Sequence, residues 1–156
     1  MDTTSGSVVI DGVEPADAWA LISDVTRTGE WSPENTGGRW IGGASAPVEG
    51  ARFVGHNRNG VFRWWTTCRV IAAVPGRRFA FDVSAGPVQV ARWDWTLQPV
   101  DGGTEVTLAW TDRRAGPLGW LMRNTGIVAV GARIDRAHVQ RNIARSLERL
   151  PGLLAR

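Results

Sequence analysis

The alternation of apolar and polar residues predicts that most of the chain is β-sheet. From residue 36 to residue 112 the pattern has a period of two, and turn-forming pairs such as Asn59-Gly60 and Pro75-Gly76 interrupt it at regular intervals. A period of two is typical of strands with one buried face. The short connections favour an antiparallel meander. Six strands are expected, at residues 37–41, 50–57, 61–73, 77–84, 89–98 and 104–112.

The chain before the meander predicts one strand and two short helices. Residues 7–11 are a short apolar-rich run that predicts a strand. Pro15 and its acidic neighbours suit the first turn of a helix, and the apolar residues that follow have helical spacing, which predicts a helix at 15–23. Asp24 is expected to cap a second short helix at residues 24–28.

Helical spacing returns after Pro117 and continues almost to the end of the chain. We expect one helix of roughly thirty residues, about 45 Å long at the usual rise per residue. Pro151 and Gly152 are expected to end it. Gly126 and Gly131 interrupt the stripe, and the sequence leaves open whether they kink the helix or delay its start.

This order of elements predicts an α+β fold in which residues 1–156 form one domain. A curved antiparallel sheet of seven strands buries its apolar face most economically by wrapping around the long C-terminal helix. The two short helices follow the first strand. A strongly curved sheet does not close completely on one helix, so we expect an apolar cavity between them.

Strand alternation predicts which side chains face that cavity, because successive residues point to opposite faces. The apolar set of each strand is taken to face the helix, which gives an aromatic wall with a few polar groups, typical of a ligand pocket. The alternative is a solid core, but small residues on the facing helix (Thr125, Gly126, Ala129 and Ala132) favour a cavity. The predicted ligand-binding residues are Phe53, Asn57, Phe62, Trp64, Thr66, Cys68, Phe79, Phe81, Trp93, Trp95, Trp110, Leu121, Thr125 and Val128.

Composition narrows the class of protein. The chain has nine tryptophans and no tyrosine, a large stock of rigid apolar surface. All 18 cationic side chains are arginines, and acids are interleaved with them to leave a net charge of +3, so we expect no nucleic-acid partner. A single cysteine cannot form an internal disulfide. With no signal peptide and no apolar run of roughly 20 residues, we expect a cytoplasmic protein without integral membrane association.

Five segments resemble a known family. They are DVTRTGEWSPE at 24–34, GARFVGHN at 50–57, Trp64 with TTCRV at 66–70, PGRRFAF at 75–81, and GGTEVT at 102–107. Together they are similar to the bacterial polyketide cyclase/dehydrase-like branch of the START and birch-pollen-allergen superfamily (SRPBCC), over nearly the whole chain. The resemblance implies a helix-grip fold with a deep hydrophobic cavity. It does not imply one activity, because members differ in function.

Candidates for chemistry each have a structural alternative. Cyclases of this family are understood to use arginine, tyrosine or serine-type groups, and this chain has no tyrosine to match. His56 is a proton shuttle or a surface residue, and Cys68 a nucleophile or a small buried side chain. Asp94 is expected to point outward, beside Arg92. Polar residues on the last helix (Asp135, Arg136 and His138) form a polar floor of the cavity or a solvated face. The remaining candidates are Glu34, Arg69 and Asp112.

Three functions are consistent with these residues. The first is binding of a hydrophobic or aromatic small molecule, lipid or polyketide-like. The second is a polyketide cyclase/dehydratase-type enzyme that uses Asn57, Thr66 or His56 to orient a carbonyl group. The third is a protein-interaction module with an arginine-rich last helix. We expect no cofactor and no metal, since two histidines 82 positions apart and one cysteine lack ligand spacing. A homodimer is left open.

Overall fold

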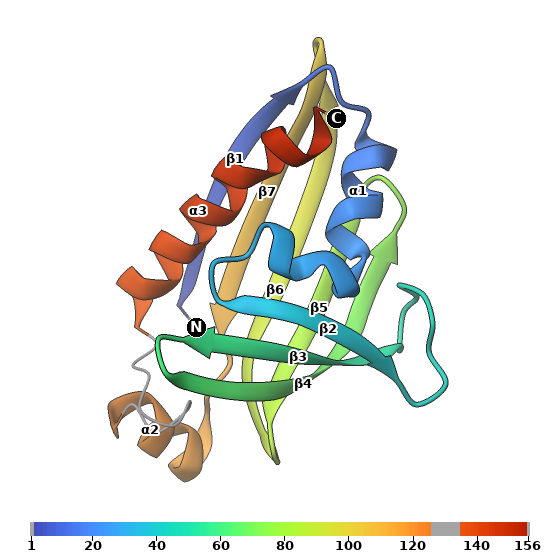
Figure 1. The fold of residues 1–156 in the computed structure, drawn as a ribbon. Coiled ribbons are helices and arrows are strands. Elements are labelled where there is room, and N and C mark those ends of the chain that lie inside the picture. Colours follow the sequence, from blue (N-terminus) through green and yellow to red (C-terminus); the bar gives the residue numbers. More distant parts are fainter. Residues whose placement is uncertain (1, 126–134, 156) are drawn as a thin grey trace.

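The protein is built around one antiparallel sheet of seven strands (Figure 1). The computed structural model describes residues 2–125 and 135–155. Within them the strand order is β1-β7-β6-β5-β4-β3-β2, so the last six strands form the predicted meander and β1 closes it beside β7. The strands are β1 (Thr3–Asp11), β2 (Asn35–Ile41), β3 (Arg52–Asn59), β4 (Phe62–Val74), β5 (Arg78–Ala85), β6 (Val88–Val100) and β7 (Gly103–Asp112).

Two short helices follow β1, as predicted. Helix α1 (Pro15–Ser23) begins with its proline at the first turn. A 3₁₀-helix, η1 (Val25–Glu30), is capped by Asp24, whose side chain accepts a hydrogen bond from the Thr26 backbone N–H at 3.1 Å. The Trp19 indole N–H donates to the Arg78 carbonyl at 2.9 Å, which docks α1 onto β5.

The prediction of one thirty-residue C-terminal helix was wrong. In the C-terminal part of the chain, the described residues form two separate helices, α2 (Gly116–Thr125) and α3 (Arg136–Leu154). Asp135 starts α3 anew, because its side chain caps the helix by accepting from the His138 backbone N–H at 2.9 Å. Gly126 and Gly131 lie outside the described residues. None of the described helices is both long and apolar enough to cross a membrane.

The predicted end of the last helix was also too early. Pro151 lies inside α3, which continues to Leu154. Leu150 is fully buried, and Leu153 and Leu154 pack against the core. These apolar contacts hold the last turn in place although the proline removes one backbone hydrogen bond.

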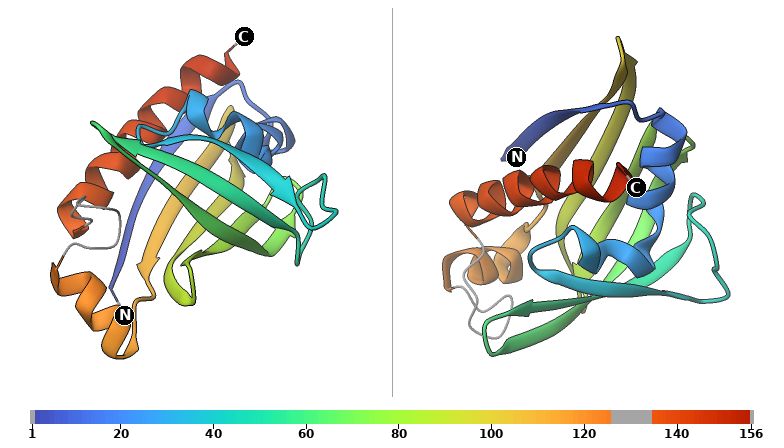
Figure 2. Two further views of the ribbon diagram at one scale, coloured as in Figure 1. Left: turned by 60° about the horizontal axis from the view of Figure 1, so that its bottom comes forward. Right: turned by 45° about the horizontal axis from the view of Figure 1, so that its top comes forward.

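Helix α3 crosses the concave face of the sheet and packs chiefly against β1 and β7 (Figure 2). Gly6 in β1 permits this close approach, because a Cβ atom there would lie 3.0 Å from a methyl carbon of Ile143 and 3.1 Å from one of Leu147. The helix therefore lies tightly on the β1 edge, and the sheet curves away from it toward β4 and β5. This arrangement confirms the predicted curved sheet around a C-terminal helix.

The convex face of the sheet carries paired charges. Arg78 and Asp94 form a two-bond ion pair at 3.0 and 2.6 Å, and Arg92 and Asp82 form another at 2.6 and 3.0 Å. Asp94 thus points outward as expected, although its partner is Arg78 of β5. These residues take no part in the concave side.

Candidate ligand cavity

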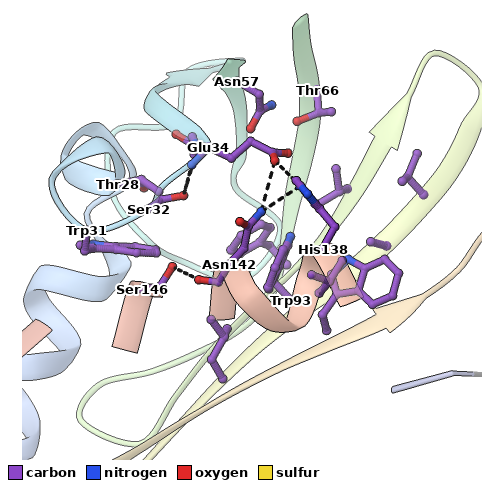
Figure 3. Close-up of a pocket in the computed structure, with 18 of the residues that line it drawn as sticks. Thr28, Trp31, Ser32, Glu34, Asn57, Thr66, Trp93, His138, Asn142 and Ser146 are labelled. Atoms are coloured by element: carbon purple, nitrogen blue, oxygen red, sulfur yellow. Dashed lines mark hydrogen bonds and ion pairs between the residues drawn. The ribbon is translucent and has the colours of Figure 1, made fainter. Parts of the chain in front are cut away.

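A cavity of about 140 Å³ lies between the sheet, α3 and the segment that joins η1 to β2 (Figure 3). Half of its lining residues come from strands β4 to β7, which present inward residues to it. The other half, mostly polar, comes from η1 and the segment after it, from β2 and β3, and from one face of α3. Six aromatic side chains contribute to the wall: Trp31, Trp64, Phe81, Trp93, Trp95 and Trp110.

The aromatic wall is held in place by contacts between rings. Trp31 meets Trp95 edge to face, with ring centroids 5.1 Å apart and planes at 83°. Trp93 and Trp110, on the neighbouring strands β6 and β7, have centroids 6.5 Å apart. Edge-to-face and tilted pairs of this kind are favourable beyond the area that they bury. These contacts position four of the six rings relative to one another.

A polar cluster of Glu34, His138 and Asn142 occupies one side of the cavity (Figure 3). Oε2 of Glu34 lies 2.5 Å from Nε2 of His138 and 3.2 Å from Nδ2 of Asn142. An ionised carboxylate only accepts hydrogen bonds, so the His138 Nε2–H and the Asn142 amide both donate to it. Glu34 and His138 are mostly buried, with 17 and 18 % of their side-chain surfaces exposed.

Local structure places each member of this cluster. The Ser32 hydroxyl accepts from the Asn35 backbone N–H at 3.0 Å, which forms a turn around Glu34. The Glu34 carbonyl accepts from the Arg58 backbone N–H at 2.9 Å and ties that turn to β3. His138 lies in the first turn of α3, and Asn142 follows four residues later on the same helix face.

Comparisons with known proteins identify the family. The pattern that defines the family described as polyketide cyclase / dehydrase and lipid transport matches residues 1–151. The chain belongs to this family. The predicted SRPBCC membership is thereby confirmed. No protein of curated function matches the chain.

Solved structures show the same fold as this polyketide cyclase / dehydrase and lipid transport family member. The protein CV1439 from Chromobacterium violaceum has a TM-score of 0.71 at 15% identity, covering 99% of this chain and 97% of its own. Ara h 8.0201 has a TM-score of 0.68 at 12% identity, covering 99% and 97%. The Polyketide_cyc-like protein Cgl2372 from Corynebacterium glutamicum is 29% identical, with a TM-score of 0.53 and coverage of 98% and 85%. The helix-grip fold is confirmed.

Seven of the predicted ligand-binding residues line the cavity in this structure. They come from β3 to β7, and the alternation of inward and outward residues brings them together: Asn57, Trp64, Thr66, Phe81, Trp93, Trp95 and Trp110.

The other predicted strand residues lie elsewhere. Phe53, Cys68 and Phe79 are buried but do not line the cavity, and both phenylalanines pack on Phe81, at 5.1 and 5.6 Å between ring centroids. Phe62 is 40% exposed, because it begins β4 at a hairpin tip beyond the reach of α3. Alternation predicts which face of the sheet a residue lies on, but it does not predict whether that part of the strand borders the cavity.

Of the predicted helical residues, Leu121 does not line the cavity. Leu121 is exposed on α2. The side chain of Thr125 and the whole of Val128 lie outside the part of the chain that the structure describes, as do Gly126, Ala129 and Ala132. The helical side of the wall is instead formed by α3, through His138, Val139, Asn142 and Ser146.

Several lining residues were missed by sequence reasoning. Val90 lines the cavity beside Ala91, which strand alternation places on the inward face, because the β5–β6 register shifts between Val83 and Ser84 and such a bulge turns two successive residues to one side. The other missed group is the segment around η1, where a tryptophan followed by Ser-Pro was interpreted only as the end of a helix. That segment contributes Thr28, Trp31, Ser32 and Asn35, together with Glu34, which the sequence indicated only as a candidate for chemistry.

Of the candidates for chemistry, only Glu34 and His138 meet in the cavity. His56 and Arg69 are exposed, and neither lines the cavity. Burial raises the pKa of the Cys68 thiol to about 12, so it is held as a neutral side chain. The arginines of the interaction hypothesis, at positions 141, 145 and 149, are exposed on α3.

Asp112, at the end of β7, forms a buried ion pair with Arg114. Burial acts to raise the pKa of this carboxyl, but hydrogen bonds from Arg114 at 2.9 and 2.8 Å outweigh it and hold the pKa below its usual range. The pair is almost fully buried.

Proposed function

We propose that the protein binds a hydrophobic, aromatic small molecule in the cavity between the sheet and α3. The observation that carries this proposal is the wall of six aromatic side chains around a partly open cavity of about 140 Å³. Sites for small molecules are typically concave and apolar, with a few polar groups that orient the ligand. The family description, which names polyketide cyclases and lipid transport, agrees with a ligand of this class.

The experiment fills the cavity by mutation. Ala91 lines the space and is 2% exposed, so Ala91→Leu places three additional carbon atoms in the volume that the ligand needs. We expect calorimetry to show toluene binding to the wild type and a loss of about tenfold or more in Ala91→Leu, since burial of one aromatic ring contributes several kcal/mol.

Ala109→Leu is the matched control. Ala109 lies in β7 between the inward residues Leu108 and Trp110, so its side chain points to the opposite face. We expect it to bind toluene as the wild type does. Absence of toluene binding to the wild type, or equal binding to Ala91→Leu, contradicts the proposal.

Acid–base catalysis in the same cavity is a second candidate function. It is favoured by the Glu34–His138 pair, because a histidine oriented by a carboxylate is a common proton-transfer unit. The test is incubation with poly-β-ketone mimics across a range of pH. Product formed by the wild type and not by His138→Gln supports an enzyme, and no product above background argues against it.

A further inference from the structure

The charges that line the cavity differ from those of the chain as a whole. All 18 cationic side chains of the protein are arginines. Among the lining residues that the structure describes there is no arginine, and the one carboxylate is that of Glu34. Of the lining residues that the structure describes, only His138 can carry a positive charge, and its Nε2 already bonds to Glu34. A carboxylate on the ligand would therefore lie near that of Glu34 with no arginine to pair with, which disfavours its binding.

The carboxylate of Glu34 has one oxygen in use and one oxygen available. Oε2 accepts from His138 and Asn142. Within the described residues, no hydrogen bond is made to Oε1. This oxygen can therefore accept a hydrogen bond from a ligand that brings an N–H or O–H group. Asn57 and Thr66 line the same cavity as Glu34 and add polar groups to its wall (Figure 3).

The size of the cavity limits the apolar part of the ligand. A dry apolar cavity of about 150 Å³ accommodates one benzene ring. The cavity here, about 140 Å³ and partly open, has room for an apolar group of that size. Its wall offers aromatic faces and edges, among them Trp93 and Trp110, against which one ring packs well.

We infer that the cavity selects a single-ring aromatic molecule that carries one hydrogen-bond donor, and that Oε1 of Glu34 accepts from that donor. This inference rests on the proposed binding function and names its ligand class. Phenol represents the class, toluene is the same ring without the donor, and benzoate carries a negative charge in place of the donor.

The order of affinities distinguishes this inference from simple apolar binding. A purely apolar cavity prefers toluene, because phenol must give up its hydrogen bonds to water. A cavity with an available carboxylate oxygen prefers phenol, because a hydrogen bond to a charged acceptor is stronger than one between neutral groups. We expect phenol to bind at least about tenfold more tightly than toluene, and benzoate more weakly than either.

The test is calorimetric titration of the full chain with phenol, toluene and benzoate. Tighter binding of phenol, with benzoate weakest, supports the inference. If toluene binds as tightly as phenol, the inference is overturned, but the proposed function still holds. Benzoate binding more tightly than phenol also overturns it. If toluene does not bind at all, the proposed function itself fails, and the inference fails with it.

Variants assign the preference to Glu34. In Glu34→Leu we expect the advantage of phenol over toluene to fall to about twofold or less, since the acceptor is lost. In Glu34→Gln, which keeps the size of the side chain and removes its charge, we expect benzoate to gain about fivefold or more. Glu105→Gln is the matched control, because Glu105 is a carboxylate on the opposite face of β7, bonded to Gln98. An unchanged phenol preference in Glu34→Leu, or no gain for benzoate in Glu34→Gln, overturns the inference.

Discussion

The indole ring of Trp31 stands edge-on against that of Trp95, with centroids 5.1 Å apart. Trp95 belongs to the centre of the sheet, on β6, whereas Trp31 belongs to the segment that leads from η1 into β2. Their contact fixes this segment over the concave face. Glu34, three residues after Trp31, is thereby brought to α3, where its carboxylate meets His138. The contact therefore supports both the aromatic wall and the polar cluster.

Trp31→Ala is expected to lower the free energy of unfolding by about 3 kcal/mol or more, because a ring that is 6% exposed leaves a large void. Trp120→Ala removes the same side chain from α2, where it is 58% exposed, and is expected to change stability by about 0.5 kcal/mol or less. Urea denaturation followed by far-ultraviolet circular dichroism measures both. Equal effects of the two substitutions contradict the role given to Trp31.

Cys68 is expected to make the protein less stable at alkaline pH. Its thiol has a pKa of about 12 in the folded chain, against 9.0 as the ordinary value, so the unfolded chain loses this proton first. The stabilising contribution is complete below pH 9 and is lost as pH rises toward 12, at up to about 1.4 kcal/mol per pH unit. The chain has no tyrosine and no lysine, so no other side chain titrates in this range.

The measurement is the free energy of unfolding between pH 9 and pH 11, for the wild type and for Cys68→Ala. We expect a falling curve for the wild type and a nearly flat curve for the variant, whatever the variant's absolute stability. Parallel curves mean that Cys68 is not the group responsible.

The strand side of the cavity is the part that sequence predicts best. Successive residues of a strand point to opposite faces. In β6, Trp93 and Trp95 are separated by Asp94, so the sequence itself indicates which residues point inward and which point outward. The same rule fails where the geometry is interrupted. The bulge that adds Val90 to the wall leaves no clear mark in the local sequence.

The polar cluster is the part that the sequence could not bring together. Glu34 and His138 are 104 positions apart, and each was considered alone as a candidate for chemistry. Their contact depends on where α3 begins and on how the η1–β2 segment folds back, and both are set by tertiary packing. The start of α3 does have a local signal, because Asp135 is a good capping residue. Continuous apolar spacing through residues 117–150 obscured that signal.

The nine indole N–H groups of the protein give the most direct test of the central claim, that an apolar ligand occupies this cavity. Each gives its own ¹⁵N–¹H signal, and toluene is the ligand to add. We expect shifts in the signals of the lining residues Trp31, Trp64, Trp93, Trp95 and Trp110, and little change in those of Trp19, Trp40, Trp65 and Trp120. Unmoved signals from the lining residues, or shifts confined to the exposed Trp65 and Trp120, contradict the account.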